Sequence, residues 1–351
     1  MGLSYYREIR CPDGVILSID KVVIDGCFRF SVDDDGGGNG MVALFFNWLR
    51  HYGTYTKEIN YEVWESVKLA TFRQQFRFLC DDNNSFWLGI HFNSYSNDDF
   101  RKSCRRWRLE FNPNKVAFDF SFWRVLYLLL SLSSGFPHAD MPLIRHFDLA
   151  IDYPVSRSCC TLVKDGRTYG EYCNSVEDRT QTLGKHNHHG FIKLYNKQIE
   201  SKLPIPLTRL ELTVDYDKRL YDDFEQIFPK VYFIDDYRMK MDSAKLNDTD
   251  LFILSVVMEN PEKLKLLGRK KKEKIERILD EYAQLLEISR KFYKKIIRQL
   301  DDFVNMNFVM NVFADNDMEL PVADLSDLVG VYRDAITGEK FKLEFPENFL
   351  K

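Results

Sequence analysis

Four short segments of this chain alternate apolar and polar residues. They cover residues 106–111, 145–152, 191–197 and 209–215. Because successive side chains of a β-strand point to opposite faces, each segment is predicted to be a strand with one apolar and one polar face. If the four strands share one sheet, their apolar faces can cover a single core and their polar faces stay open.

The polar faces of these strands gather charged groups and one tyrosine hydroxyl. The polar positions are Arg106, Arg108 and Glu110 in the first segment, Asp148 and Asp152 in the second, Lys193 and Tyr195 in the third, and Arg209, Glu211, Thr213 and Asp215 in the fourth. On a shared sheet the open face collects Asp148, Asp152, Glu211 and Tyr195. Carboxylates beside a tyrosine and cations fit a metal-assisted phosphodiester site.

Other segments before residue 248 predict further strands and helices. Strand composition is found at residues 15–20, 21–25 and 86–92, and helices are predicted over residues 41–52, 63–77 and 120–132. The order of strand, helix and strand over residues 106–152 is typical of an α+β fold. We expect a mostly antiparallel sheet with helices packed on its apolar face, followed by a helical C-terminal region.

The C-terminal third of the chain has a helical pattern. Asp248 or Thr249 is predicted to cap a helix over residues 251–258, and Gly268 is predicted to end the helical segment that precedes it. A long amphipathic helix is then expected, with an apolar stripe from Ile275 to Phe303. In the tail, residues 331–343 predict a hairpin that turns at residues 337–338.

Basic residues are concentrated in this helical region. Residues 261–300 hold 13 Lys or Arg against 6 Asp or Glu, a local charge of +7 in a chain whose net charge is -4. The side chains concerned include Arg269, Lys270, Lys271, Lys272, Lys294 and Lys295. A basic element on an acidic protein can hold phosphates, because binding depends on the local field. A solvated helix face and a dimer interface are the alternatives.

Length and composition exclude several classes of protein. A chain of 351 residues with 45% hydrophobic residues has a prior of about two domains with substantial cores. The apolar run at residues 125–130 is far shorter than the roughly 20 residues of a spanning helix, and the amino terminus has no secretory signal pattern. We expect a cytoplasmic protein without membrane contact. Seven cysteines without CxxC spacing predict reduced thiols.

Four motifs occur in a recognisable order. They are Arg-Leu-Glu-Phe-Asn-Pro-Asn-Lys at residues 108–115, His-Phe-Asp-Leu-Ala-Ile-Asp at 146–152, Phe-Ile-Lys-Leu-Tyr-Asn-Lys at 191–197 and Arg-Leu-Glu-Leu at 209–212. Together they resemble the Rep_trans family, the replication initiators of staphylococcal-type rolling-circle plasmids. The resemblance covers residues 106–224, roughly a third of the chain, and conjugative relaxases of some integrative elements are similar too.

The resemblance implies a DNA nicking and joining enzyme. Tyr195 matches the tyrosine that attacks one strand, which would leave a 5′-phosphotyrosine adduct and a free 3′ hydroxyl. Asp148 and Glu211, with Asp152 and Glu110 less clearly matched, correspond to ligands of a divalent metal, for which hard oxygen donors favour Mg²⁺ or Mn²⁺. Lys193 is predicted to favour the phenolate, because a free phenol with a pKa near 10 is a weak nucleophile at neutral pH.

The resemblance also suggests partners and an organisation of the chain. Expected partners are double-stranded origin DNA, a single-stranded nick site, a second copy of the chain and a host helicase. Arg108, Arg209, Lys197, Arg269, Lys270, Lys271, Lys272, Lys294 and Lys295 are predicted to contact DNA. Residues 1–104 would be the β-rich start of the catalytic region, residues 105–230 the nicking sheet, and residues 231–351 the DNA-recognition region with its tail.

Several alternatives stay open. The loop with His186, His188 and His189 departs from the family pattern and would suit a zinc or copper site, a DNA contact or plain surface. Tyr153, Tyr216 and Tyr221 are rivals for the nucleophile. A conjugative relaxase and a DNA-binding protein that has lost the chemistry are the alternative functions.

Overall fold

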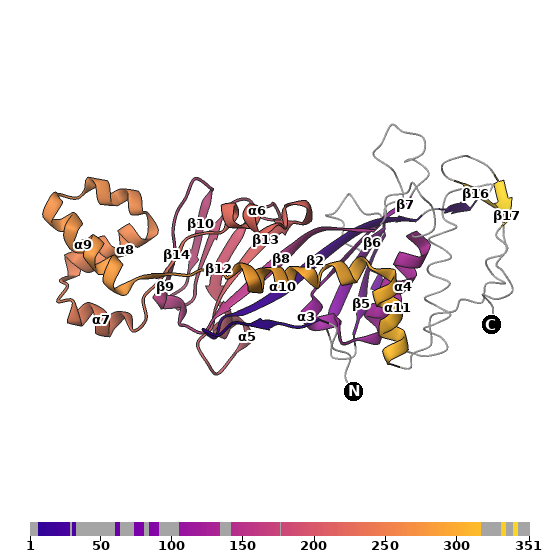
Figure 1. Ribbon diagram of the computed structural model, residues 1–351, viewed down its shortest axis with the longest axis horizontal. Coiled ribbons are helices and arrows are strands. Elements are labelled where there is room, and N and C mark those ends of the chain that lie inside the picture. The colour runs from indigo at the N-terminus through magenta and orange to yellow at the C-terminus, as the bar shows by residue number, and fades with distance from the viewer. Residues whose placement is uncertain are drawn as a thin grey trace. The chain divides into compact units, whose positions relative to one another are not determined.

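The computed structural model describes residues 6–28, 30–32, 60–63, 74–80, 84–90, 105–133, 142–175, 177–316, 331–334 and 340–342 (Figure 1). The chain forms two compact units, each built from segments that are distant in sequence. Unit 1 comprises Met1–Arg7, Lys21–Arg145 and Arg298–Lys351, and unit 2 comprises Glu8–Asp20 and His146–Ile297. These boundaries differ from the three predicted segments, because each unit is defined by packing rather than by position along the chain.

Unit 2 is built on an antiparallel sheet. Its strands are β1 (Ile9–Arg10), the first part of β2 (Ile16–Phe28), β8 (Leu143–Tyr153), β10 (Tyr169–Cys173), β11 (Arg179–Leu183), β12 (Ile192–Asn196) and β13 (Thr208–Asp215). The strand order is β10-β11-β12-β13-β8-β2, and β1 pairs with β2. A smaller sheet joins β9 (Cys160–Leu162), β14 (Val231–Phe233) and β15 (Gln284–Leu285).

The alternation predicted from the sequence is present in this sheet. Leu149, Ile151, Leu194, Leu210 and Leu212 are fully buried, as expected for a core-facing row. The strands β8, β12 and β13 coincide with the predicted segments to within two residues at each end. The apolar face of the sheet therefore forms the core, and the polar face holds the candidate chemistry. The prediction that the polar face stays open is wrong for its centre, because Asp152, Tyr195, Arg209 and Thr213 are buried as well.

The helices of unit 2 follow the strand β13, except that α5 lies between β12 and β13. They are α5 (Lys197–Ser201), α6 (Tyr221–Ile227), α7 (Tyr237–Ser243), α8 (Asp248–Glu259), α9 (Arg269–Tyr282) and α10 (Arg290–Arg298), with 3-10 segments at Arg157–Cys159, Tyr216–Lys218 and Pro261–Leu266. The side chains of α7, α8 and α9 share a small core that includes Met241, Leu254 and Ile275. Figure 1 shows these three helices grouped together.

The long amphipathic helix predicted after Gly268 is wrong. Two helices, α9 and α10, replace it, and the chain between them forms β15. Leu285 pairs with Tyr232 of β14, and the Leu286 N–H donates to the Val231 carbonyl at 3.1 Å. These bonds hold the backbone extended, so the helix ends at Tyr282. Gly268 is the N-cap of α9 rather than the end of the preceding segment.

The cap of α8 also differs from the prediction. Asn247, rather than Asp248 or Thr249, accepts a hydrogen bond from the Asp250 N–H at 2.8 Å. An asparagine side chain satisfies a free N–H of the first helical turn as well as an aspartate does.

Unit 1 contains a second antiparallel arrangement. Its strands are the rest of β2, β7 (Arg105–Phe111), β6 (Ser85–Ile90), β5 (Gln74–Leu79) and β4 (Asn60–Val63), in that order, with a separate sheet of β17 (Lys340–Lys342), β16 (Val331–Asp334) and β3 (Phe30–Val32). Its helices are α3 (Pro113–Val116), α4 (Phe120–Ser133) and α11 (Met306–Asp315), with a 3-10 segment at Asp301–Val304.

An aromatic cluster holds unit 1 together. Phe122 of α4 packs on Phe111 of β7 at 4.6 Å and on Phe86 of β6 at 5.5 Å between ring centroids. Phe303 stacks on Trp123 at 5.9 Å and meets Phe111 at 5.0 Å. Helix α4 therefore covers the apolar face of the strands, and the chain after residue 298 belongs to this core.

The predictions for the N-terminal region are corrected in one place. The helix over residues 63–77 is wrong at both ends, because Val63 closes β4 and Gln74 begins β5. Phe76 and Phe78 are buried at alternate positions of β5, a period of two that is typical of a strand.

The predicted helix over residues 41–52 and the turn at residues 337–338 lie outside the described residues, whereas β16 and β17 do pair antiparallel.

The fold is α+β, with mostly antiparallel sheets and helices toward the C-terminus, as the sequence predicted. Among the residues that the structure describes, no helix combines the length and the apolar character needed to cross a membrane.

Candidate functional site

The polar face of unit 2 is ordered by the register of three strands. Tyr195 of β12 lies opposite Arg209 of β13, which lies opposite Asp152 of β8. In the next row Lys193 lies opposite Glu211. Paired residues of neighbouring strands project to the same side of a sheet, so these five side chains share one face.

Tyr195 and Glu211 make the central contact. The Tyr195 hydroxyl donates a hydrogen bond to Glu211 Oε1 at 2.5 Å. Lys193 Nζ lies 4.1 Å from the centre of the tyrosine ring and Lys197 Nζ lies 5.9 Å from it. Tyr195 is only 5% exposed, but these neighbours are a carboxylate and two ammonium groups rather than core side chains.

Burial shapes the proton chemistry of this pair. The pKa of the Tyr195 hydroxyl is raised, first by burial and then by the adjacent Glu211 carboxylate. The pKa of Glu211 is raised as well, mainly because burial disfavours its charged form. The predicted phenolate stabilised by Lys193 is therefore not favoured at rest. The geometry instead suits transfer of the tyrosine proton to Glu211 during a reaction.

Arg209 and Asp152 form a buried ion pair beside the tyrosine. Arg209 Nε donates to Asp152 Oδ1 and Arg209 Nη2 to Asp152 Oδ2, both at 2.6 Å, and Arg209 Nη1 donates to Asp20 Oδ1 at 3.1 Å. A bidentate pair of this kind fixes both side chains. Both oxygens of Asp152 are thus engaged, and the guanidinium of Arg209, predicted to contact DNA, is held inside the protein.

The four predicted metal ligands do not form a set. Asp148 Oδ1 accepts a hydrogen bond from the Thr213 hydroxyl at 2.7 Å, Asp152 is paired with Arg209, and Glu211 is bonded to Tyr195. Glu110 belongs to unit 1, where Lys21 Nζ lies 3.0 Å from its carboxylate. The part of the chain that the structure describes holds no group of three or more His, Cys, Asp or Glu side chains placed to bind a metal. As arranged, the carboxylates do not fit a divalent ion.

Apart from Arg209, the predicted DNA-contacting residues fall into two groups. Engaged with acidic partners are Arg108 with Asp25, Lys197 with Glu200, Arg269 with Glu273, Lys271 with Asp250 and Lys272 with Glu276. Lys270 of α9 and Lys294 and Lys295 of α10 are exposed. The pair of Arg269 with Glu273 lies on the surface, because the Arg269 side chain is 91% exposed, so Arg269 stays accessible as well.

The histidine loop has a structural contact. His189 Nδ1 accepts a hydrogen bond from the Asp215 N–H at 3.1 Å, and burial lowers the pKa of its imidazole. The His186 ring packs edge-on against Phe191 at 5.1 Å. Among the described residues, the histidines of this loop do not join a group of three or more His, Cys, Asp or Glu side chains that could hold zinc or copper.

The rival tyrosines have other surroundings. Tyr153 is buried, and its hydroxyl has no hydrogen-bond partner among the described residues. The Arg219 guanidinium lies 3.7 Å from the centre of the Tyr216 ring, and the Tyr221 hydroxyl donates to the Ile288 carbonyl at 3.1 Å.

A second tyrosine–carboxylate pair was missed in the sequence. The Tyr169 hydroxyl donates to Glu171 Oε2 at 2.6 Å, accepts from Gln181 Nε2 at 2.9 Å, and its pKa is raised to about 12, mainly by burial. Lys164 Nζ lies 4.2 Å from the centre of its ring. Gln181 lies opposite Leu194, so this pair is on the other face of the sheet from Tyr195. The alternation of Tyr169 and Glu171 was the available signal.

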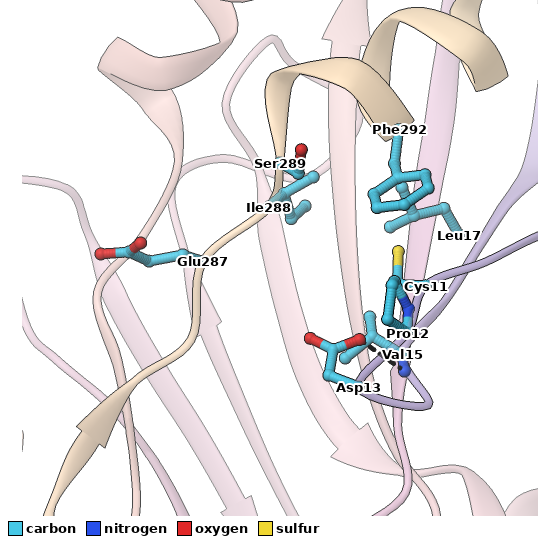
Figure 2. Close-up of a pocket in the computed structure, with 9 residues that line it drawn as sticks. All are labelled: Cys11, Pro12, Asp13, Val15, Leu17, Glu287, Ile288, Ser289 and Phe292. Atoms are coloured by element: carbon cyan, nitrogen blue, oxygen red, sulfur yellow. Dashed lines mark hydrogen bonds between the residues drawn. The ribbon is translucent and has the colours of Figure 1, made fainter.

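A small pocket lies elsewhere in unit 2 (Figure 2). Its walls come from the segment that joins β1 to β2, with Cys11 and Val15, from Ile288 in the segment that leads into α10, and from Phe292 of α10 itself. Its volume of about 60 Å³ is far below the about 300–1,000 Å³ of typical ligand sites. None of its lining residues belongs to the polar face.

Comparisons with known proteins give a distant structural likeness and no match of sequence. No family model and no curated protein matches the chain. Among solved structures, a rolling circle replication initiator protein from Geobacillus stearothermophilus is similar at 13% identity, with a TM-score of 0.31, over 82% of this chain and 97% of that chain.

Proposed function

We propose that this protein is a DNA nicking and joining enzyme that initiates rolling-circle replication, with Tyr195 as its nucleophile. The four ordered motifs support this function. The observation that carries it is the hydrogen bond from the Tyr195 hydroxyl to Glu211, on a polar sheet face with Lys193 over the ring.

The reaction is a transesterification. The Tyr195 oxygen attacks a backbone phosphorus and gives its proton to Glu211, which acts as general base. The bond from phosphorus to the 3′ oxygen breaks, and this oxygen takes up a proton to become a free 3′ hydroxyl. The 5′ phosphate stays linked to the tyrosine, so the reverse reaction can rejoin the strand.

Lys193 and Lys197 have an electrostatic role in this proposal. Each carries its charge near the Tyr195 ring and can offset the charge that develops on the phosphate. Because the tyrosine is almost fully buried, a phosphate reaches the hydroxyl only after side chains that cover it move aside. Nicking therefore requires a local rearrangement when DNA binds.

The DNA duplex would be held by the exposed ammonium groups of α9 and α10, chiefly Lys270, Lys294 and Lys295. A dependence on Mg²⁺ or Mn²⁺ stays a prediction, and no step of the proposed reaction is assigned to a metal.

The test is incubation of the protein with supercoiled DNA of its own replicating element, in the presence of Mg²⁺ or Mn²⁺. Tyr195→Phe should abolish both the nick and the protein-linked 5′ end, because phenylalanine has no oxygen to attack phosphorus. Tyr169→Phe is the matched control, since it removes the same hydroxyl from a similar pair on the other face. A covalent adduct formed by the Tyr195→Phe protein would overturn the assignment.

One observation favours a second candidate function. The raised pKa and the burial of Tyr195 would also suit a DNA-binding protein that has kept the fold without the chemistry. Such a protein would bind its origin specifically, but the wild-type chain would leave supercoiled origin DNA uncut.

A further inference from the structure

An exposed aromatic side chain lies on the same sheet face as Tyr195, two strands away. Tyr172 of β10 lies opposite Thr180 of β11. Thr182 of β11 lies opposite Lys193 of β12, and Thr180, two residues from Thr182, projects to the same side. Tyr172, Thr180 and Tyr195 therefore occupy one row across three strands. The backbones of neighbouring strands are about 4.8 Å apart. The Cα atoms of Tyr172 and Tyr195, two strands apart, are therefore separated by about 10 Å.

Small residues line the surface between and beside the two tyrosines: Thr180 lies in their row, and Gly170 and Thr182 lie in the next row with Lys193. Gly170 lies opposite Thr182, and the Thr182 hydroxyl donates to the Gly170 carbonyl at 3.3 Å, across the position of the missing side chain. A Cβ atom on Gly170 would lie 2.6 Å from Thr182 Oγ1. With Thr180 the surface forms a low shelf, bounded by Tyr172 on one side and by Lys193 and Tyr195 on the other.

Tyr172 differs from the other aromatic residues of this sheet. It is 64% exposed, whereas Tyr195 is 5% exposed and Tyr153 is 2% exposed. Its strand is at the end of the strand order among the described strands of unit 2, so its ring is open to a ligand that lies along the sheet. Single-stranded nucleic acid binds to surfaces where bases stack on exposed rings and phosphates meet cationic groups farther along the strand. Here the ring is that of Tyr172, and the cations are those at Tyr195, two strands away.

We propose that Tyr172 is a base-stacking platform for single-stranded DNA, and that it holds a nucleotide next to the phosphate that Tyr195 attacks. Base stacking on Tyr172 does not depend on the proposed function, whereas the place of the nucleotide next to the attacked phosphate rests on it. Lys193 and Lys197, which lie over the Tyr195 ring, supply the charge that the sugar-phosphate backbone needs at the inner end of the shelf.

The experiment measures binding without cleavage. The probes are a fluorescein-labelled oligothymidylate of about 12 nucleotides, in the range of sites for single-stranded DNA, and an abasic strand of the same length and charge. Fluorescence anisotropy gives the affinity of the full chain for each. Tyr172→Ala should weaken binding of oligothymidylate about 5- to 100-fold and leave binding of the abasic strand unchanged, whereas Tyr172→Trp should keep the wild-type affinity.

Phe252→Ala is the matched control, because it removes an aromatic ring that is 68% exposed on α8. It should bind both strands as the wild-type chain does. Circular dichroism should report the same fold for all variants. Equal oligothymidylate affinity of wild type and Tyr172→Ala, an equal loss for both strands, or a wild-type chain that does not prefer oligothymidylate would each overturn the proposal.

The outcome is independent of the nicking assay. If Tyr172→Ala weakens binding of oligothymidylate but the protein forms no adduct, the stacking role of Tyr172 is supported and the nicking activity is rejected. If the protein forms an adduct on Tyr195 and Tyr172→Ala binds oligothymidylate as the wild-type chain does, the stacking role is rejected and the nicking activity is supported.

Discussion

Tyr195 and Glu211 show how much a local pattern can specify about single residues. Alternation placed both on the polar face of the sheet, and the register of β12 and β13 brings them into contact. The pattern did not indicate which charged neighbours would pair. Arg209 lies opposite Asp152, so its guanidinium forms an ion pair with that carboxylate and is buried inside the protein.

The pH dependence of nicking tests the role of Glu211. Its carboxylate accepts a proton only when ionised, and burial raises its pKa above the ordinary value of about 4.3. The nicking rate should therefore rise with pH through this raised pKa. Glu211→Gln should lower the rate about 10²- to 10⁴-fold and remove this acidic limb. A single-turnover rate profile of supercoiled DNA cleavage gives the measurement.

Glu171→Gln is the control for this prediction, because Glu171 accepts the hydroxyl of Tyr169 in the same way on the other sheet face. Its rate profile should match that of the wild-type chain. A Glu211→Gln protein with the wild-type rate and the same acidic limb would contradict the general-base role.

At the scale of elements, the basic residues at the start of α9 differ in their contacts. Asp250 of α8 is buried and accepts from Lys271 and from Lys274, the latter at 2.5 Å. These hydrogen bonds lower the pKa of Asp250. Lys271 therefore ties α9 to α8, whereas Lys270 on the same turn is exposed and is one of the residues that we propose to contact DNA.

Replacing these two neighbours should separate stability from DNA binding. Lys271→Gln should lower the free energy of unfolding by about 1 kcal/mol, a modest value because the lysine is partly exposed and Lys274 remains. Lys270→Gln should leave stability unchanged and weaken duplex binding, with a salt slope smaller by about one. Urea unfolding and duplex titrations at several salt concentrations measure the two effects.

The pH dependence of the Lys271 effect has a defined sign. A carboxylate with a lowered pKa contributes stability above its unfolded value of about 3.9, and this contribution is lost as the pH falls through its folded pKa. The difference in the free energy of unfolding between wild type and Lys271→Gln should therefore shrink in acid.

Equal DNA affinity of Lys270→Gln and wild type would exclude Lys270 from the DNA contact.

At the scale of the whole molecule, residues close in sequence belong to different cores. Phe303 was predicted to extend the stripe of a DNA-recognition helix, yet it packs on Trp123 and Phe111 in unit 1. Phe303→Ala should cost about 3–5 kcal/mol, the usual loss for a buried phenylalanine. Met310→Ala, at an exposed position of α11, is the control and should cost far less. Chemical denaturation followed by tryptophan fluorescence compares the two.

The metal requirement is a prediction, and we expect it to appear only when the protein and its DNA are together. Because Asp148, Asp152 and Glu211 each have their own partner, the free chain should bind Mn²⁺ weakly in a calorimetric titration. Nicking should nevertheless stop in EDTA and resume with Mg²⁺ or Mn²⁺, as the family resemblance implies. Full activity in EDTA would remove the metal from the proposal.

The sequence by itself determined the strands, their two faces and the α+β class, because alternation is a local property of the chain and a core needs one apolar face. Helix α4 and the strands β7, β8, β12 and β13 followed from such patterns. The strand β5 was misassigned as part of a helix. A short segment of mixed apolar and polar residues fits both the helical and the strand period, and its pairing with a neighbouring strand decides between them.

Tertiary structure alone decided the break between α9 and α10, the division into two units and the pairing of each charge. The break depends on hydrogen bonds from residues 285 and 286 to β14, and the units depend on contacts such as that between Phe303 and Trp123. The partner of each carboxylate depends on register, which aligns residues far apart in sequence. These interactions join distant segments, so a pattern read along the chain does not contain them.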